Sequence, residues 1–138
     1  RYETRWKKIM LINAIPQYIQ NITNAKADLT GTGVVTLYTA PSGAEFNASV
    51  VNSILVSEDS GNADTVTVTL TNGSDVFSLF KVAAVGANAT VELLTHSLVL
   101  QGGEILKVQA ATGNRLHVVA SIQEYAQNRS TSSTLSQI

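Results

Sequence analysis

Two histidines, His96 and His117, are the side chains of this 138-residue chain that could carry acid–base chemistry near neutral pH. General acid–base catalysis also needs a second group that orients the histidine. His117 stands in an alternating run, on the face opposite Leu116 and Val118, which predicts a surface or interface residue. His96 lies at a break between two expected strands, and the sequence contains no G-x-S-x-G nucleophile elbow. We therefore predict that the protein is not an enzyme.

Metal and cofactor motifs are missing as well. The acidic loop 58–64 has enough oxygen atoms for Ca²⁺, but it lacks the D-x-[DN]-x-[DN]-G order and is interpreted as a solvated turn. No cysteine is present, so a thiolate site is excluded. The glycines of 31–33 lead into an expected strand instead of a helix N-terminus, so no helix dipole would meet a phosphate. We predict no metal and no cofactor.

The start of the chain carries its one cationic and aromatic cluster, formed by Arg1, Tyr2, Arg5, Trp6, Lys7 and Lys8. A single cluster on a protein with a net charge of −1 argues against nucleic acid as a partner. Tryptophan rimmed by cations is typical of protein interfaces, where aromatic anchors fill pockets. The predicted interface residues are Trp6, Ile9, Ile12, Ile15, Tyr18 and Ile19.

The composition predicts a protein that associates with neighbours. Only 14% of the residues are charged, against about 25% in a usual globular protein, and 44% are hydrophobic. Serine and threonine fill much of the remainder. A weakly charged surface gives little protection against association. No run approaches the roughly 20 apolar residues of a membrane span, so we expect no membrane partner.

The elements that must position any site are β-strands. Residues 65–71 alternate threonine with Val66, Val68 and Leu70, which places the apolar side chains on one face of a strand. Asn72-Gly73 between two such runs is a strong hairpin signal. Expected strands lie near 33–39, 45–57, 64–72, 76–83, 89–95, 97–100, 104–110 and 115–123. About eight antiparallel strands predict an all-β fold, a single jelly-roll-like β-sandwich.

Three zones follow along the chain: an N-terminal arm or docking segment over 1–30, the β-sandwich domain over 31–125, and a polar C-terminal tail over 126–138. In the arm, the spacing of Ile12, Ile15, Ile19 and Ile22 fits a helical stripe. Isoleucine is a poor helix former, and Pro16 is tolerated only in a first turn. A short helix over 17–24 and an extended arm are both open at this stage.

The strand region resembles a family of small structural proteins in tailed-bacteriophage virions. The resemblance covers roughly residues 29–125, and its motifs are signatures of turns and strands. The matching stretches are 29–32, 36–43, 53–57, 65–70, 91–94, 98–110 and 116–124. The resemblance implies a β-sandwich subunit on the particle, as a capsid decoration, a head-fibre base, or part of the neck or tail. It carries no functional residues across.

These observations together lead us to expect a non-enzymatic virion structural protein that oligomerises and docks on other virion proteins through its N-terminal arm. A homo-oligomer is expected because weakly charged strand edges need covering, and a trimer is preferred. A capsid decoration or head-associated subunit is the first expectation, and a neck or tail subunit is the alternative. A carbohydrate-binding jelly-roll module is the rival of another class, although Tyr38, Phe46, Phe77 and Phe80 are expected to pack in the core.

Overall fold

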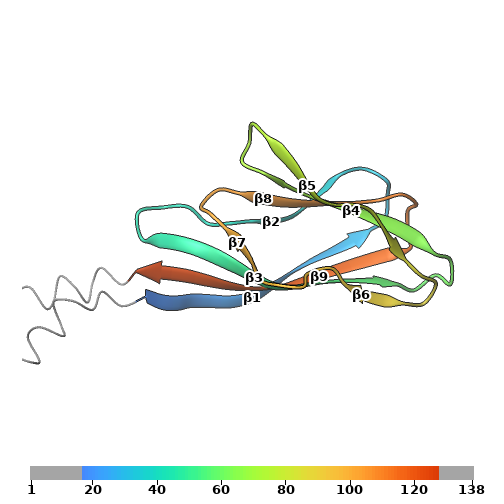
Figure 1. Ribbon diagram of the computed structural model, residues 1–138, viewed down its shortest axis with the longest axis horizontal. Coiled ribbons are helices and arrows are strands. Elements are labelled where there is room, and N and C mark those ends of the chain that lie inside the picture. Colours follow the sequence, from blue (N-terminus) through green and yellow to red (C-terminus); the bar gives the residue numbers. More distant parts are fainter. Residues whose placement is uncertain (1–16, 128–138) are drawn as a thin grey trace, which may run out of the picture.

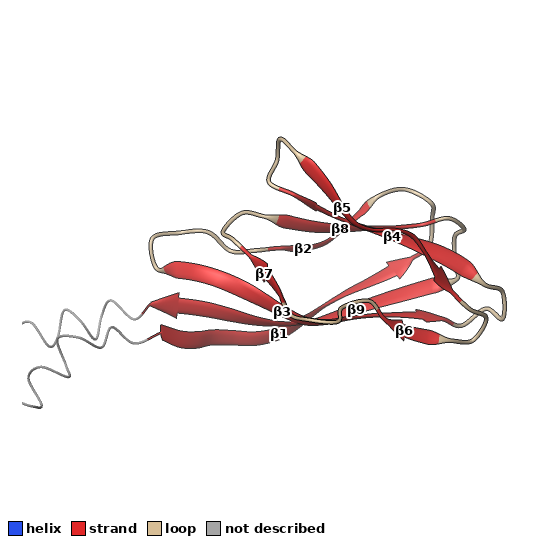
Figure 2. Cartoon of the chain, in the orientation of Figure 1, coloured by secondary structure: helices blue, strands red, loops and turns tan. Residues whose placement is uncertain are grey.

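The computed structural model describes residues 17–127, apart from the side chains of Gln17, Tyr18, Asn47 and Gln127. This part of the chain is all β, as expected (Figure 1, Figure 2). The strands are β1 (Gln17–Leu29), β2 (Val35–Thr39), β3 (Phe46–Glu58), β4 (Asp64–Thr71), β5 (Val76–Val85), β6 (Thr90–Glu92), β7 (Leu98–Leu100), β8 (Ile105–Ala110) and β9 (Leu116–Gln127). Each of the eight expected strands is confirmed, and β1 is an additional one.

Two antiparallel sheets form the sandwich. Sheet A has the order β1-β9-β3-β6, with β7 also paired to β3, and sheet B has the order β2-β8-β4-β5. Figure 1 shows the two layers facing each other along the long axis. The strands pair in a nested order: β1 with β9, β2 with β8, β3 with β6 and β7, and β4 with β5. This nested pairing places the first and last strands side by side in sheet A, and the expected all-β sandwich is confirmed.

The alternation of small β-branched residues builds the core between the sheets. Val66 and Val68 of β4 are fully buried, as the Thr-Val pattern predicts. Sheet A contributes Leu116, Val118, Ala120 and Ile122 from β9, together with Val51, Ile54 and Val56 from β3. Sheet B adds Leu106, Val108 and Ala110 from β8. Tyr38, Phe46 and Phe80 pack against this core as expected, whereas Phe77 is 52% exposed.

The first strand decides between the short helix and the extended arm that the sequence leaves open, because residues 17–24 lie in a β-strand. A β-bulge between Ile19 and Asn21 shifts the register of β1 against β9. Ile19 pairs with Tyr125 and Ile22 pairs with Gln123, so both isoleucines lie on the outer face of the sheet although they are three residues apart. The extra residue of the bulge thus produced a spacing that resembles a helical period.

The expected zone boundaries also change. Residues 17–29 belong to sheet A, because β1 pairs with β9 over its full length, and β9 continues to Gln127 beyond the expected end at 125. The sandwich therefore spans 17–127 of the described chain. Residues 1–16 and 128–138 lie outside the described residues. Since Gln17 pairs with Gln127, the strands that adjoin both terminal segments end at the same pole of the sandwich (Figure 1).

The exposed edges of the sheets differ in how they are protected. The edge strand β5 carries two register shifts against β4, and such bulges hinder pairing with another chain. The other edge of sheet B, β2, has five residues, and the far edge of sheet A is split between β6 and β7 with three residues each. Among the described strands, β1 presents the longest edge, of 13 residues with one register shift.

The β8–β9 turn closes against the loop that follows β1. The amide of Asn114 donates to the carbonyl of Leu29 over 2.9 Å. Gly113 lies so close to the Thr30 carbonyl that a Cβ atom at this position would fall well inside contact distance of that oxygen. A side chain at 113 would therefore push the two loops apart.

We predict that Gly113→Ala lowers the free energy of unfolding by about 1–3 kcal/mol, the usual cost of overpacking a tight contact. The control is Gly31→Ala in the facing loop, where a Cβ atom would meet nothing within 4 Å. Urea unfolding followed by circular dichroism measures both variants. Equal stabilities for the two variants would contradict the close contact between the loops.

Candidate interaction surfaces

The outer face of sheet A is built by the alternation in β9 and its neighbours. Because Leu116, Val118, Ala120 and Ile122 point into the core, the residues between them point away from sheet B. Their partners in β1 and β3 point the same way, since directly paired residues share a face. This outer face therefore crosses β1, β9 and β3. Beyond β3 it reaches β7 at one end and β6 at the other.

Apolar side chains cover the end of this face near Gln17 and Gln127. Paired residues in these rows lie only about 4.5–5.5 Å apart at Cβ, so their side chains form one surface. Ile22 is 72% exposed and Val99 is 56% exposed. The first row contains Ile22, Gln123, Val50 and Val99, and the second contains Ile19, Tyr125 and Ala48. We define the apolar patch as Ile19, Ile22, Val50, Val99 and Tyr125.

Carboxylates gather at the other end of the same face. Nε2 of His117 lies 3.3 Å from Oδ1 of Asp28, and Nδ1 lies 3.5 Å from Oδ2 of Asp59. In the next row, Lys26 and Glu92 flank the apolar Val119 and Leu55. We define the acidic end as Asp28, Asp59 and Glu92. The face thus changes from apolar to mainly anionic along its length.

Glu92 stays charged because donors converge on it at the sheet edge. Burial raises the pKa of Glu92, but the hydroxyl of Ser53 and the amides of Ile54 and Leu94 lower it below its usual range. The Ile54 amide lies 2.7 Å from Oε2. The acidic end therefore keeps this negative charge at neutral pH.

His117 has the neighbours of a catalytic triad but not the geometry. Asp28, His117 and Ser57 follow one another across β1, β9 and β3. A triad needs one ring nitrogen directed at the hydroxyl, whereas both nitrogens of His117 face carboxylates. The carboxylates of Asp28 and Asp59 approach different nitrogens of the ring. Across residues 17–127 no three His, Cys, Asp or Glu side chains form a group that could hold a metal ion.

The acidic loop after β3 is exposed over 59–63, as expected for a solvated turn, whereas the carboxylates at its two ends, Glu58 and Asp64, are buried. Glu58 is 3% exposed, and its carboxylate accepts from the amide and hydroxyl of Ser60, each over 2.5 Å, and from the amides of Gly61 and Asn88, each over 3.0 Å. Burial raises the pKa of Glu58, but these hydrogen bonds outweigh it and lower the pKa to about 2. Glu58 therefore joins its own loop to the β5–β6 connection.

A polar cluster joins the two sheets behind the apolar patch. Tyr38 of sheet B reaches sheet A, where its hydroxyl bonds Ser49 over 2.7 Å and the carboxylate of Glu124. Asn21 of β1 donates to the same carboxylate over 3.2 Å. Burial and the bond to Glu124 raise the pKa of Tyr38 to about 12. Since Ser49 is fully buried, the cluster fixes the spacing of the sheets at this pole.

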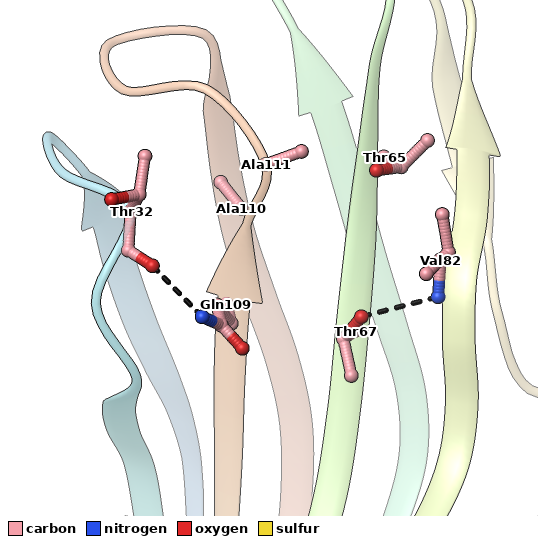
Figure 3. A pocket seen from close by; sticks show the side chains of 7 residues that line it. All are labelled: Thr32, Thr65, Thr67, Val82, Gln109, Ala110 and Ala111. Atoms are coloured by element: carbon pink, nitrogen blue, oxygen red, sulfur yellow. Dashed lines mark hydrogen bonds between the residues drawn. The ribbon is translucent and has the colours of Figure 1, made fainter.

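Sheet B carries a shallow depression of a different chemistry on its outer face. Its volume is about 370 Å³ and its lining has hydroxyl and amide groups without a formal charge (Figure 3). The side-chain amide of Gln109 donates to the carbonyl of Thr32 over 2.9 Å across one rim. The lining consists of Thr32, Thr65, Thr67, Val82, Gln109, Ala110 and Ala111.

Val82 forms the opposite rim in a strained conformation. Its φ of 54° is unusual for a β-branched residue, and it occurs at a bulge of β5. The Val82 amide donates to the Thr67 hydroxyl over 3.1 Å, and its side chain is 59% exposed (Figure 3). The bulge thus turns an apolar side chain toward solvent beside the threonines.

Some of the predicted interface residues lie within the described residues 17–127, and others lie outside them. Ile19 lies in the apolar patch and is 46% exposed. Tyr18 belongs to β1, and its side chain is not described. Trp6, Ile9, Ile12 and Ile15 lie outside the described residues. The interface assignment therefore stays a prediction. The strand residues of the apolar patch other than Ile19 were missed, because alternation alone does not tell which face of a strand is uncovered.

No family model matches this chain, and no curated protein matches it. Two structures of a pentameric capsid protein isolated from metagenomic phage sequences have 16% and 15% identity and a TM-score of 0.45 each. The match covers 80% of this chain in both, but only 63% and 66% of those chains. A chain in the acidic stable capsid structure of Helicobacter pylori bacteriophage KHP30 has 14% identity and a TM-score of 0.51, covering 79% of this chain and 91% of that one. The likeness to KHP30 concerns the fold.

We predict that Glu58 makes stability depend on pH in the acid range. Because its folded pKa is lowered from 4.5 to about 2, its contribution is complete above pH 4.5 and is lost as the pH falls toward 2. Glu58→Gln should melt at a lower temperature than wild type at neutral pH and approach it near pH 2. Thermal unfolding at a series of pH values measures this, with Glu45→Gln in the exposed loop before β3 as control. A constant difference between Glu58→Gln and wild type across the range would refute the role of Glu58.

Proposed function

We propose that this chain is a non-enzymatic structural protein of a bacteriophage virion, a capsid decoration or head-associated subunit that forms a homo-oligomer and docks through its N-terminal segment. The observation that carries the proposal is the apolar patch of sheet A, whose residues Ile19, Ile22 and Val99 are exposed. Exposed apolar groups gathered on one face are typical of interaction sites, whereas single exposed ones are common on any protein.

The likeness to the KHP30 capsid chain supports this proposal, since the two share a fold over most of both chains. The resemblance of residues 29–125 to small virion proteins, seen in the sequence, points the same way. The arrangement of His117 favours a structural role, because its ring nitrogens are both directed at carboxylates and neither at a nucleophile. The place on the particle is proposed as the head, and the neck or tail is the alternative.

The exposed edge of β1 supports oligomer formation, in addition to the apolar patch of sheet A. The long edge of β1 carries backbone groups that can pair with another chain, and Lys26 and Asp28 are its charged residues within the described part. A trimer is our expectation for the number of subunits. It rests on the need to cover such edges.

We predict that the protein is present in purified particles at a fixed copy number. Quantitative mass spectrometry against the major capsid protein and the portal measures that number. A copy number comparable to the capsid protein supports shell decoration, and one comparable to the portal supports the neck or tail alternative. If the protein is absent from particles that are otherwise complete, the virion role is wrong.

The depression on sheet B favours a second candidate, a carbohydrate-binding module. Its volume of about 370 Å³ lies at the low end of the range of small-molecule sites. Threonine hydroxyls and the Gln109 amide can exchange hydrogen bonds with an uncharged sugar, while Val82 offers an apolar contact. This function would be compatible with a place on the particle surface.

If the depression binds sugars, Thr65→Val should weaken binding, because it removes a lining hydroxyl and keeps the size of the side chain. Saturation-transfer NMR with glucose, galactose, mannose and N-acetylglucosamine, each at about 10 mM, would detect the millimolar affinities of such shallow sites. Thr36→Val, on the same sheet face but outside the depression, is the matched control. A lack of signal from all four sugars with wild-type protein would exclude this candidate.

A further inference from the structure

We propose that residues 1–16 of one copy dock along the outer face of sheet A of a second copy, with Ile15 at the apolar patch and the segment 5–8 at the acidic end. This inference rests on the proposed function, because it names the partner surface of the N-terminal segment in the oligomer. The evidence for it is that residues 1–16 match the outer face of sheet A in polarity, in charge and in length.

The polarity of the segment follows the polarity of the face. Apolar residues occupy its second half, with Ile9, Ile12 and Ile15 as the branched side chains. The apolar patch lies at the pole where Gln17 and Gln127 pair. A segment that ends next to Gln17 thus brings its apolar half to this pole of the neighbouring molecule when the two poles meet. Burial of Ile22, which is 72% exposed, then contributes to association.

The charges match in the same orientation. Arg5, Lys7 and Lys8 precede the apolar half, and Glu3 is the acidic residue among them. The other end of the face has three carboxylates, defined above as the acidic end, and two cations close by, Lys26 and Arg115. Opposite charges at one end fix both the direction and the register of a docked segment, which apolar contacts alone do not.

The lengths agree as well. From residue 5 to residue 15 an extended chain spans roughly 33 Å, at about 3.3 Å per residue. From Ile19 to Asp28 the strand β1 spans roughly 30 Å at the same rise. The cations therefore reach the acidic end when Ile15 lies over Ile19.

The short connection to β1 assigns the docked segment to a second copy. To return over its own sheet, the chain would need a reversal of about four residues between Ile15 and β1. Only Pro16 separates Ile15 from Gln17, which already pairs with Gln127. A proline also disfavours helical backbone at the residue before it, and a tight reversal needs such backbone.

The absence of cysteine makes the inference directly testable, because single thiols can be placed at will. One full-length chain carries Ile12→Cys, and a second full-length chain of different tag length carries Ile22→Cys. The two are mixed and treated with a short bis-maleimide. The control replaces Ile22→Cys by Val82→Cys, which is similarly exposed but lies on sheet B.

We expect the mixed cross-linked species to exceed the control by more than about tenfold, because docking raises the effective concentration of the two thiols. Charge reversal of Lys7 and Lys8 to glutamate should reduce it. A double variant, Ile12→Cys with Ile22→Cys, that cross-links only within one chain overturns the assignment to a second copy. Yields equal to the control overturn the docking itself. Neither result tests the virion role, which is tested by the copy number in purified particles. A failure of the docking proposal can therefore be distinguished from a failure of the proposed function.

Discussion

The pairing of β9 with both β1 and β3 is the constraint on which the remainder of the sandwich depends. β9 is the last strand of the described chain, yet it lies in the middle of sheet A and carries four consecutive inward side chains of the core. Sheet A therefore has no continuous inner face until the last strand is in place. Most of the contacts that close the molecule join residues far apart in the sequence, which is typical of slowly folding β-proteins.

The two outer faces that this arrangement creates differ in their chemistry. Sheet B turns threonines of β4 outward, opposite Lys107 and Gln109 of β8. Sheet A turns Ile22, Val99 and Leu55 outward, which water solvates poorly. A sandwich that carries an apolar patch at one end of the outer face of sheet A is suited to contacting a neighbour through that end. This sidedness arises from the phase of the alternation in each sheet.

The strands and turns of 31–125 were predictable because local signals agree there with the tertiary structure. Val66 and Val68 alternate with threonine, and Asn72-Gly73 sets the hairpin that follows. β1 was not predictable, because the bulge after Ile19 places Ile19 and Ile22 on one face at a helical spacing. The apolar patch was hidden for a related reason: Val50 and Val99 come together from two strands that are distant in sequence. Likewise, Glu58 reads as a surface residue until Asn88 is brought beside it.

The shared pole of β1 and β9 has a mechanical consequence. Gln17 and Gln127 are directly opposite, so a force that draws the two terminal segments apart acts on the β1–β9 ladder at its first pair. The hydrogen bonds of an antiparallel ladder lie across the strands, and such a load opens them one pair at a time, as a zipper. A pull between this pole and the far loops instead loads many pairs together in shear. The molecule is therefore compliant between its own ends and stiff along its length, the property of a spacer that is fastened at one pole and bears load at the other.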